Sequence, residues 1–112
     1  MFNINGEEWH VLLVSPYHPK LQRSNGLYSV GACDDITKTI YINENLENSF
    51  LKKVLCHEIT HAAMFSYNVE LNLDQEELLA EIIATYGQEI IHITNLLFKR
   101  LKDKTNKRDS LS

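Results

Sequence analysis

Two histidines four positions apart, with a glutamate directly after the first, are the residues best suited to chemistry. They form the segment His57-Glu58-Ile59-Thr60-His61. If this segment is helical, residues four apart lie on one face, so both imidazoles can reach one tetrahedral zinc ion. Glu58 can lean toward the same ion without binding it, take a proton from an attacking water and pass that proton to the leaving amine. The motif therefore predicts a zinc peptidase with Glu58 as general base.

The third zinc ligand must come from elsewhere, because a catalytic zinc site has three protein ligands and one open position. The next predicted helix offers Glu76, Glu77 and Glu81. We favour Glu77, because the small residues at positions 80, 84 and 87 share its face and would let the two helices approach closely. Glu81, one turn on, suits a hydrogen bond from the second nitrogen of a ligand histidine. A competing role for Glu77 is to complete a capping box that begins at Asp74.

The alternative to a metal site is a helix with two solvent-facing histidines and a surface glutamate. The motif is flanked by apolar residues, 54–55 and 62–64, which argues against a fully solvent-exposed helix face. We expect His10, His18 and His92 to be structural or exposed. The group that stabilises the oxyanion cannot be chosen by sequence, and candidates by residue type are Tyr17, His18, Tyr67 and Tyr86.

The elements that must position these residues indicate an α+β fold. Residues 9–14, 27–33 and 39–42 have the composition of strands, which gives a small, mostly antiparallel three-stranded sheet. Two packed helices follow, at about 47–67 with Asn45 or Asn48 as cap, and at about 74–101 with Asp74 as cap. Strand 39–42, if it borders the cleft, could pair with an extended substrate, and as an ordinary core strand it needs no such role. On the second helix, Leu79, Ile82, Ile83 and Tyr86 should pack against the sheet or core.

Length and composition predict one metallopeptidase domain over residues 1–101 and a polar, disordered tail over 102–112. The net charge of −4 and the lack of a helix-turn-helix signature argue against nucleic acid as a partner. We find no signal peptide and no stretch near the ~20 apolar residues that cross a membrane. Cys33 and Cys56 have no metal-like or redox-like spacing, so we expect a cytoplasmic protein.

These residues also resemble a known family. The segment 57–62, followed by Glu77-x-x-Ala80-Glu81-x-Ile83-Ala84, is similar to the ImmA/IrrE-like zinc metallopeptidases, above all the short versions of phages and mobile elements. The similarity covers about residues 51–91. It implies a minimal zincin-like domain, Zn²⁺ as cofactor, Glu77 as third ligand and Glu81 as the polar residue beside the ligands. It also implies a protein substrate such as a phage or mobile-element repressor.

A rival hypothesis belongs to another functional class. The chain could be a catalytically silent, zinc-stabilised module that works by binding a partner protein. A zinc position open to water would favour the peptidase, and one filled by a protein group would favour the binding module. The sequence predicts no oligomeric state.

Overall fold

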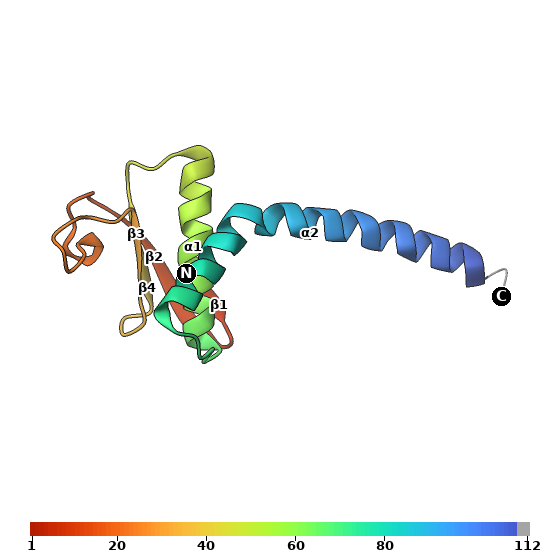
Figure 1. The fold of residues 1–112 in the computed structure, drawn as a ribbon, viewed down its shortest axis with the longest axis horizontal. Coiled ribbons are helices and arrows are strands. Elements are labelled where there is room, and N and C mark those ends of the chain that lie inside the picture. Colours follow the sequence, from red (N-terminus) through yellow and green to blue (C-terminus); the bar gives the residue numbers. More distant parts are fainter. Residues whose placement is uncertain (110–112) are drawn as a thin grey trace.

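The chain folds as a sheet followed by two helices, which confirms the α+β class. The structure is a computed structural model that describes residues 1–109, with side chains described to residue 104. The elements are β1 (Phe2–Ile4), β2 (Glu7–Val14), the 3-10 helix η1 (Pro19–Leu21), β3 (Gly31–Asp34), β4 (Thr39–Asn43), α1 (Asn48–Ser66) and α2 (Leu73–Asp109). Helix α1 lies against the sheet, and α2 begins beside α1 and then extends away from it (Figure 1).

The sheet has four strands in the order β1-β2-β4-β3, one more than the sequence predicted. The additional strand, β1, pairs antiparallel with β2 through a turn at Asn5 and Gly6. Both turn residues have positive φ, 49° and 79°, as in the type I′ turns that favour Asn-Gly. Strands β3 and β4 are also antiparallel, but β2 and β4 are parallel. A parallel pair needs a long crossover, and residues 15–38 supply it.

Strand β3 forms the edge of the sheet nearest the predicted site. It begins at Gly31 and not near residue 27, because the preceding segment is held instead by an isolated bridge between Gln22 and Tyr28. Strand β4 lies between β2 and β3, so both of its edges are already paired and residues 39–42 are buried. Of the two roles considered for this strand, the structure therefore supports the core strand and not pairing with a substrate. Only β3 offers a free edge on that side.

The core fixes helix α1 on the sheet. Trp9, Ile40 and Ile42 are fully buried and pack with Val54 and Ala62 of α1. Trp9 also donates from Nε1 to Ser66 Oγ at 2.8 Å. The amide of Asn5 donates to the Ser66 carbonyl at 3.0 Å, so the β1–β2 hairpin holds the C-terminal end of α1. The predicted His-Glu-x-x-His segment is thus set in a helix anchored along its length.

Both helices begin differently from the sequence predictions. The cap residue of α1 is Glu47, without a side-chain cap hydrogen bond, so neither Asn45 nor Asn48 caps it. At α2 the capping box lies between Asn72 and Gln75. Asn72 Oδ1 accepts a hydrogen bond from the backbone N–H of Gln75 at 2.9 Å, and Gln75 Oε1 accepts one from the backbone N–H of Asn72 at 3.2 Å. The predicted cap at Asp74 was wrong. Glu77 consequently lies beyond the capping box, and its side chain takes no part in capping the helix.

Helix α2 is longer and more exposed than expected. Ala80 and Ala84 are buried, as predicted for the face toward α1, but Ile82 and Tyr86 are exposed and do not join the core. The helix runs to Asp109, eight residues past its predicted end at Leu101. The rest of the expected tail, residues 110–112, lies outside the described residues. Within the described part of the chain, no helix has the length and hydropathy to span a membrane.

Candidate metal centre

The side chains of His57, His61 and Glu77 meet between α1 and the start of α2. The two histidines are one turn apart on α1, and their Nε2 atoms lie 3.2 Å from each other. Glu77 Oε1 lies 2.9 Å from His61 Nε2, and Glu77 Oε2 lies 3.3 Å from His57 Nε2. The sequence prediction for these three residues therefore agrees with the geometry, since their ligand atoms all lie within 4.8 Å of one another.

The spacing of these atoms fits a small tetrahedral cation. Ligands at the ~2.0–2.1 Å typical of zinc sites stand about 3.3 Å apart along the edges of a tetrahedron. The separations of 2.9, 3.2 and 3.3 Å are near that length, although the first and the last involve different oxygens of the Glu77 carboxylate. Among the residues whose side chains are described, no other group of histidine, cysteine or acidic residues is arranged in this way. The cluster can hold a metal ion with three protein ligands.

Glu76 orients one of the imidazoles. Its Oε1 lies 2.7 Å from His61 Nδ1, and both side chains are largely buried. A carboxylate accepts, so His61 donates from Nδ1, and in the neutral ring Nε2 is then the nitrogen available to a metal ion. By sequence, Glu76 was only an alternative ligand, and this role was not predicted. Adjacent glutamates on a helix point about 100° apart, so Glu76 and Glu77 can reach different atoms of one site once the angle between the two helices is set.

Glu81 lies beside the second nitrogen of His57, whereas the sequence predicted a hydrogen bond from a ligand histidine to this carboxylate. Its Oε2 is 3.5 Å from His57 Nδ1, an ion-pair distance that is long for a hydrogen bond. Its other oxygen accepts from Lys53 Nζ at 3.0 Å and from Thr85 Oγ1 at 3.1 Å. The hydrogen bond from Lys53, followed by that from Thr85, lowers the pKa of Glu81. Glu81 therefore stays ionised beside His57 and outside the metal cluster.

Glu58 is buried beside the two histidines. Only 8% of its surface is exposed, and this burial raises the pKa of its carboxyl group above the ordinary value. The neighbouring His57 and His61 act in the opposite direction, and Glu77 adds to the rise in the pKa. Gly31 makes room for this side chain, because a Cβ at that position would lie 3.1 Å from Glu58 Oε2 and 2.8 Å from a methyl of Val54.

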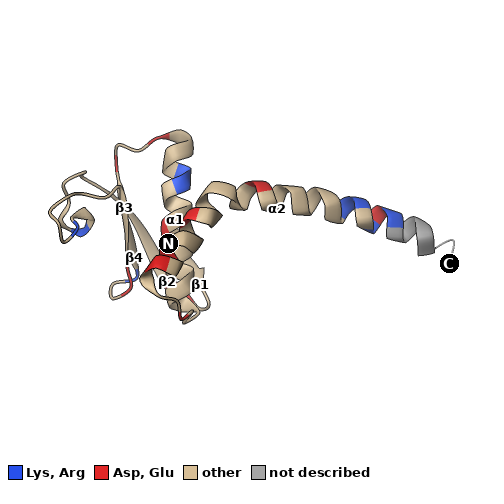
Figure 2. Ribbon diagram, in the orientation of Figure 1, with Lys and Arg blue, Asp and Glu red and all other residues tan. Residues whose placement is uncertain are grey.

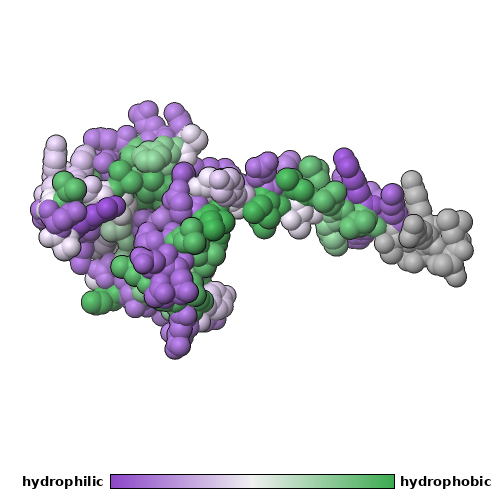
Figure 3. Space-filling view, in the orientation of Figure 1, coloured by the Kyte–Doolittle hydropathy of each residue, from purple (hydrophilic) through white to green (hydrophobic). Residues whose placement is uncertain are grey.

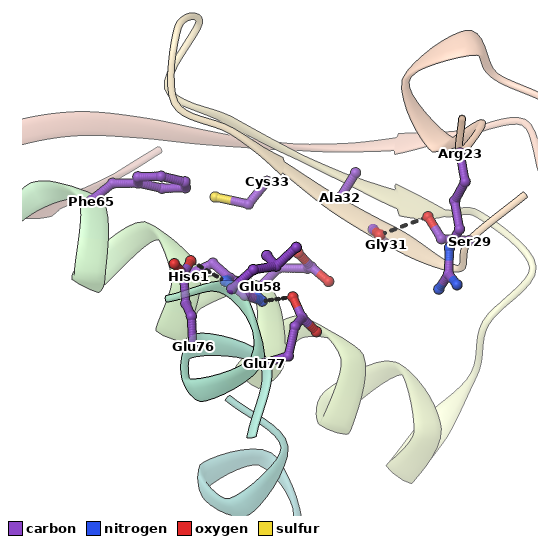
Figure 4. Close-up of a pocket in the computed structure, with 11 residues that line it drawn as sticks. Arg23, Ser29, Gly31, Ala32, Cys33, Glu58, His61, Phe65, Glu76 and Glu77 are labelled. Carbon is purple, nitrogen blue, oxygen red and sulfur yellow. Dashed lines mark hydrogen bonds and ion pairs between the residues drawn. The ribbon is translucent and has the colours of Figure 1, made fainter. Parts of the chain in front are cut away.

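The cluster opens onto two adjoining hollows beside strand β3. The first hollow, about 490 Å³, is drawn in Figure 4 and is lined by two residues of the cluster, by β3 and by nearby side chains: Arg23, Ser29, Gly31, Ala32, Cys33, Glu58, His61, Phe65, Leu73, Glu76 and Glu77. The second, about 420 Å³, is lined by Arg23, Ser29, Val30, Gly31, Phe50, Lys53, Val54, His57, Glu77 and Glu81. Because both include Glu77 and Gly31, they meet at the metal cluster.

The residues proposed by type alone for the oxyanion do not line either hollow. They are Tyr17, His18, Tyr67 and Tyr86. His18 instead accepts from the Lys20 amide and stacks on Tyr41, which is a structural role. Arg23 instead lines both hollows and brings a cationic side chain to them. It was not among the residues predicted to stabilise the oxyanion, because an isolated arginine in an irregular segment belongs to no motif.

Cys33 is the other reactive residue type in the first hollow. Burial raises the pKa of its thiol to about 12, and the charge of Glu58 adds to this effect. Cys33 and Cys56 are both free cysteines. A thiol with so high a pKa is a poor nucleophile at neutral pH. The histidines and carboxylates are therefore the reactive groups of the hollow.

Comparisons with protein-family models, curated proteins and solved structures give no significant match to this chain. The similarity to the ImmA/IrrE-like enzymes therefore stays a hypothesis that rests on the motif residues alone.

Proposed function

We propose that this protein is a zinc-dependent endopeptidase, with His57, His61 and Glu77 as zinc ligands and Glu58 as general base. The observation that carries the proposal is the shared hollow: two residues of the metal cluster, His61 and Glu77, line the same cavity as Glu58. Structural zinc sites usually have four protein ligands, whereas three ligands beside an open cavity are typical of catalytic sites. Two imidazoles and a carboxylate in tetrahedral spacing favour zinc over harder or softer metals.

The tautomer of His61 supports a bound cation. Glu76 accepts a hydrogen bond from Nδ1, which leaves Nε2 as the ring nitrogen that would bind a metal; it lies 3.2 Å from His57 Nε2 and 2.9 Å from a Glu77 oxygen. A cation bound there would be attracted by the Glu77 carboxylate and would take the place of a proton on Nε2. When bound, zinc would polarise the peptide carbonyl and bring the pKa of a water toward ~7.

Glu58 has the position and the proton affinity of a general base. It directly follows a ligand histidine, and its carboxylate opens into the first hollow (Figure 4). Its raised pKa makes it a stronger acceptor than an exposed carboxylate. In the proposed reaction it takes a proton from the attacking water at a carboxylate oxygen and gives the proton to the nitrogen of the departing peptide.

The edge of β3 suits an extended peptide. Strand β3 lines the hollows, and its outer edge is free to form backbone hydrogen bonds with a substrate chain. Side chains on either side of the cleaved bond would then enter the two hollows. Arg23, which lines both, can donate to the carbonyl oxygen as negative charge develops on it. We further propose, from the family resemblance, a cytoplasmic enzyme whose substrate is a regulatory protein of a phage or mobile element.

The test combines metal analysis with two variants. The native protein should contain about one zinc per chain by elemental analysis. Glu58→Gln should keep the zinc and lose hydrolysis of a fluorogenic peptide library by at least about 10²-fold. Glu77→Ala should lose the zinc. Turnover by Glu58→Gln would contradict the mechanism, and absence of zinc from native protein after metal addition would contradict the whole proposal. Tightly bound zinc without hydrolysis of any peptide would favour the zinc-stabilised binding module.

A further inference from the structure

Helix α2 carries a row of apolar side chains that solvent reaches. Six of them share one face, and each is between 42% and 62% exposed: Ile82, Tyr86, Ile90, Ile93, Leu97 and Leu101. Steps of three or four residues keep them in line along a helix. We call these six residues the α2 stripe. Apolar surface is visible along the projecting part of the helix in Figure 3.

The α2 stripe is large for a protein surface. It extends over about 28 Å at 1.5 Å per residue. Six half-exposed side chains of this size present roughly 500 Å², which is comparable with the largest apolar patch on a typical monomer and with those used for binding. Most of the stripe also lies on the part of α2 that extends beyond α1 (Figure 1). Helices gain most of their stability by packing an apolar face, so this one needs a cover.

The series of steps between neighbouring residues of the stripe reads the same from either end of the helix. From Ile82 to Leu101 the steps are four, four, three, four and four residues. In an antiparallel pair of α2 helices, Ile82 therefore meets Leu101, Tyr86 meets Leu97, and Ile90 meets Ile93. Such self-complementarity is what a two-fold interface requires. We propose that a second copy of this chain covers the α2 stripe as an antiparallel helix pair.

The charges of α2 favour the antiparallel direction. Residues 73–98 contain five acidic residues and no lysine or arginine, whereas Lys99, Arg100, Lys102 and Lys104 follow with one aspartate. The change from acidic to basic along the helix is seen in Figure 2. Antiparallel pairing sets the basic end of each helix beside the acidic part of the other, and parallel pairing sets like charges together.

The area is also adequate for a stable pair. The stripe supplies roughly 500 Å² per chain, and the flanking Leu78 and Leu96, which are 62% and 47% exposed, add to it. The total approaches the ~800 Å² per partner of a standard interface. The stripe contains none of the residues of the metal centre. The proposed dimer can therefore be tested independently of the proposed activity.

Light scattering of the full chain after size exclusion tests the proposal. The expected mass is twice the 13.0 kDa of one chain. Ile93→Glu places a carboxylate against the partner's Ile90 and should raise the dimer dissociation constant at least about 100-fold. Asn95→Glu, which adds the same charge on another side of α2, should leave the dimer intact. Circular dichroism checks that both variants keep their helices.

A chain that stays monomeric at about 100 µM overturns the proposal. So does a dimer that Ile93→Glu leaves unchanged, because its interface must then lie elsewhere, and so does an assembly larger than a dimer. The direction is tested by disulfide formation under mild oxidation. Tyr86→Cys mixed with Leu97→Cys should give a disulfide-linked heterodimer, with native protein as the blank for Cys33 and Cys56. Efficient cross-linking of Tyr86→Cys with itself indicates a parallel pair and overturns the proposed interface.

Discussion

The imidazole of His61 donates from Nδ1 to Oε1 of Glu76 at 2.7 Å, across the contact between α1 and α2. The next residue, Glu77, approaches the opposite nitrogen of the same ring at 2.9 Å. Two adjacent carboxylates thus bind the two nitrogens of one imidazole. One carboxylate holds the ring in place through Nδ1 and the other lies beside Nε2, the nitrogen that would bind a cation.

Removing the Glu76 carboxylate should weaken metal binding without removing a ligand. We expect Glu76→Ala to lower zinc affinity by about 10–100-fold, because His61 would no longer be held in one tautomer and orientation. Competition with a chromogenic chelator measures the affinity. Asp74→Ala, which deletes another carboxylate from the first turn of α2, is the control and should change the affinity less. Equal losses in the two variants would indicate a general effect of charge on the helix.

The capping box at Asn72 and Gln75 should stabilise the start of α2. Asn72→Ala removes a side-chain acceptor from the Gln75 amide and should lower the free energy of unfolding by about 1 kcal/mol. Asp74→Ala should lower it by about 0.5 kcal/mol or less, through the helix dipole alone. Urea unfolding in the presence of a chelator separates this effect from metal binding. A larger loss with Asp74→Ala would mean that the cap lies at Asp74.

A side chain at Gly31 should disturb the general base while sparing the metal ligands. The methyl of Gly31→Ala would lie 2.8 Å from Val54 and 3.1 Å from Glu58, so both must shift. We expect a loss of about 1–3 kcal/mol in stability and a fall in hydrolysis, with zinc content unchanged. Gly87→Ala is the matched control: its methyl meets only Ile83 of its own helix, and it should stabilise α2 by up to about 1 kcal/mol. Full activity of Gly31→Ala would show that Glu58 need not stay where it lies.

The thiol of Cys33 should react slowly near neutral pH. Its pKa of about 12 lies above the ordinary value, so the thiolate forms only as the pH rises toward 12. At pH 8 the thiolate fraction is on the order of 10⁻⁴, and alkylation should be slowed accordingly. Peptide mapping by mass spectrometry after timed iodoacetamide labelling gives the rate at Cys33 from pH 7 to 10. Rapid labelling at pH 7 would contradict the buried, protonated thiol.

The sequence predicted the candidate metal ligands better than the elements around them. The pairing of His57 with His61 follows from helical spacing, and helical phase favoured Glu77 over Glu76 and Glu81 without excluding them. The role of Glu76 depends on the angle between two helices, which no local pattern contains. The cap was misplaced because Asp74 and Asn72 both suit a cap, and only the structure shows that Gln75 returns the hydrogen bond to Asn72.

The sheet was predicted less well, because strand pairing depends on distant parts of the chain. Strand β1 has only three residues, too few for a periodic signal, and its turn at Asn5 and Gly6 was the available clue. The parallel pairing of β2 with β4 joins segments about thirty residues apart. Exposure along α2 was also missed, since an apolar residue on a helix looks the same in sequence whether the core or a partner covers it.

The length of α2 gives its anchoring at Glu77 a mechanical consequence. Leu101 lies 24 residues beyond Glu77 on the same continuous helix, which is about 36 Å at 1.5 Å per residue. A stiff rod of that length acts as a lever whose short arm ends at the metal cluster. A tilt of about 5° at Glu77 would swing Leu101 by about 3 Å, close to the rise of two helical residues. A change of ligand geometry that tilted the helix would thereby be amplified into a larger displacement of its distal end.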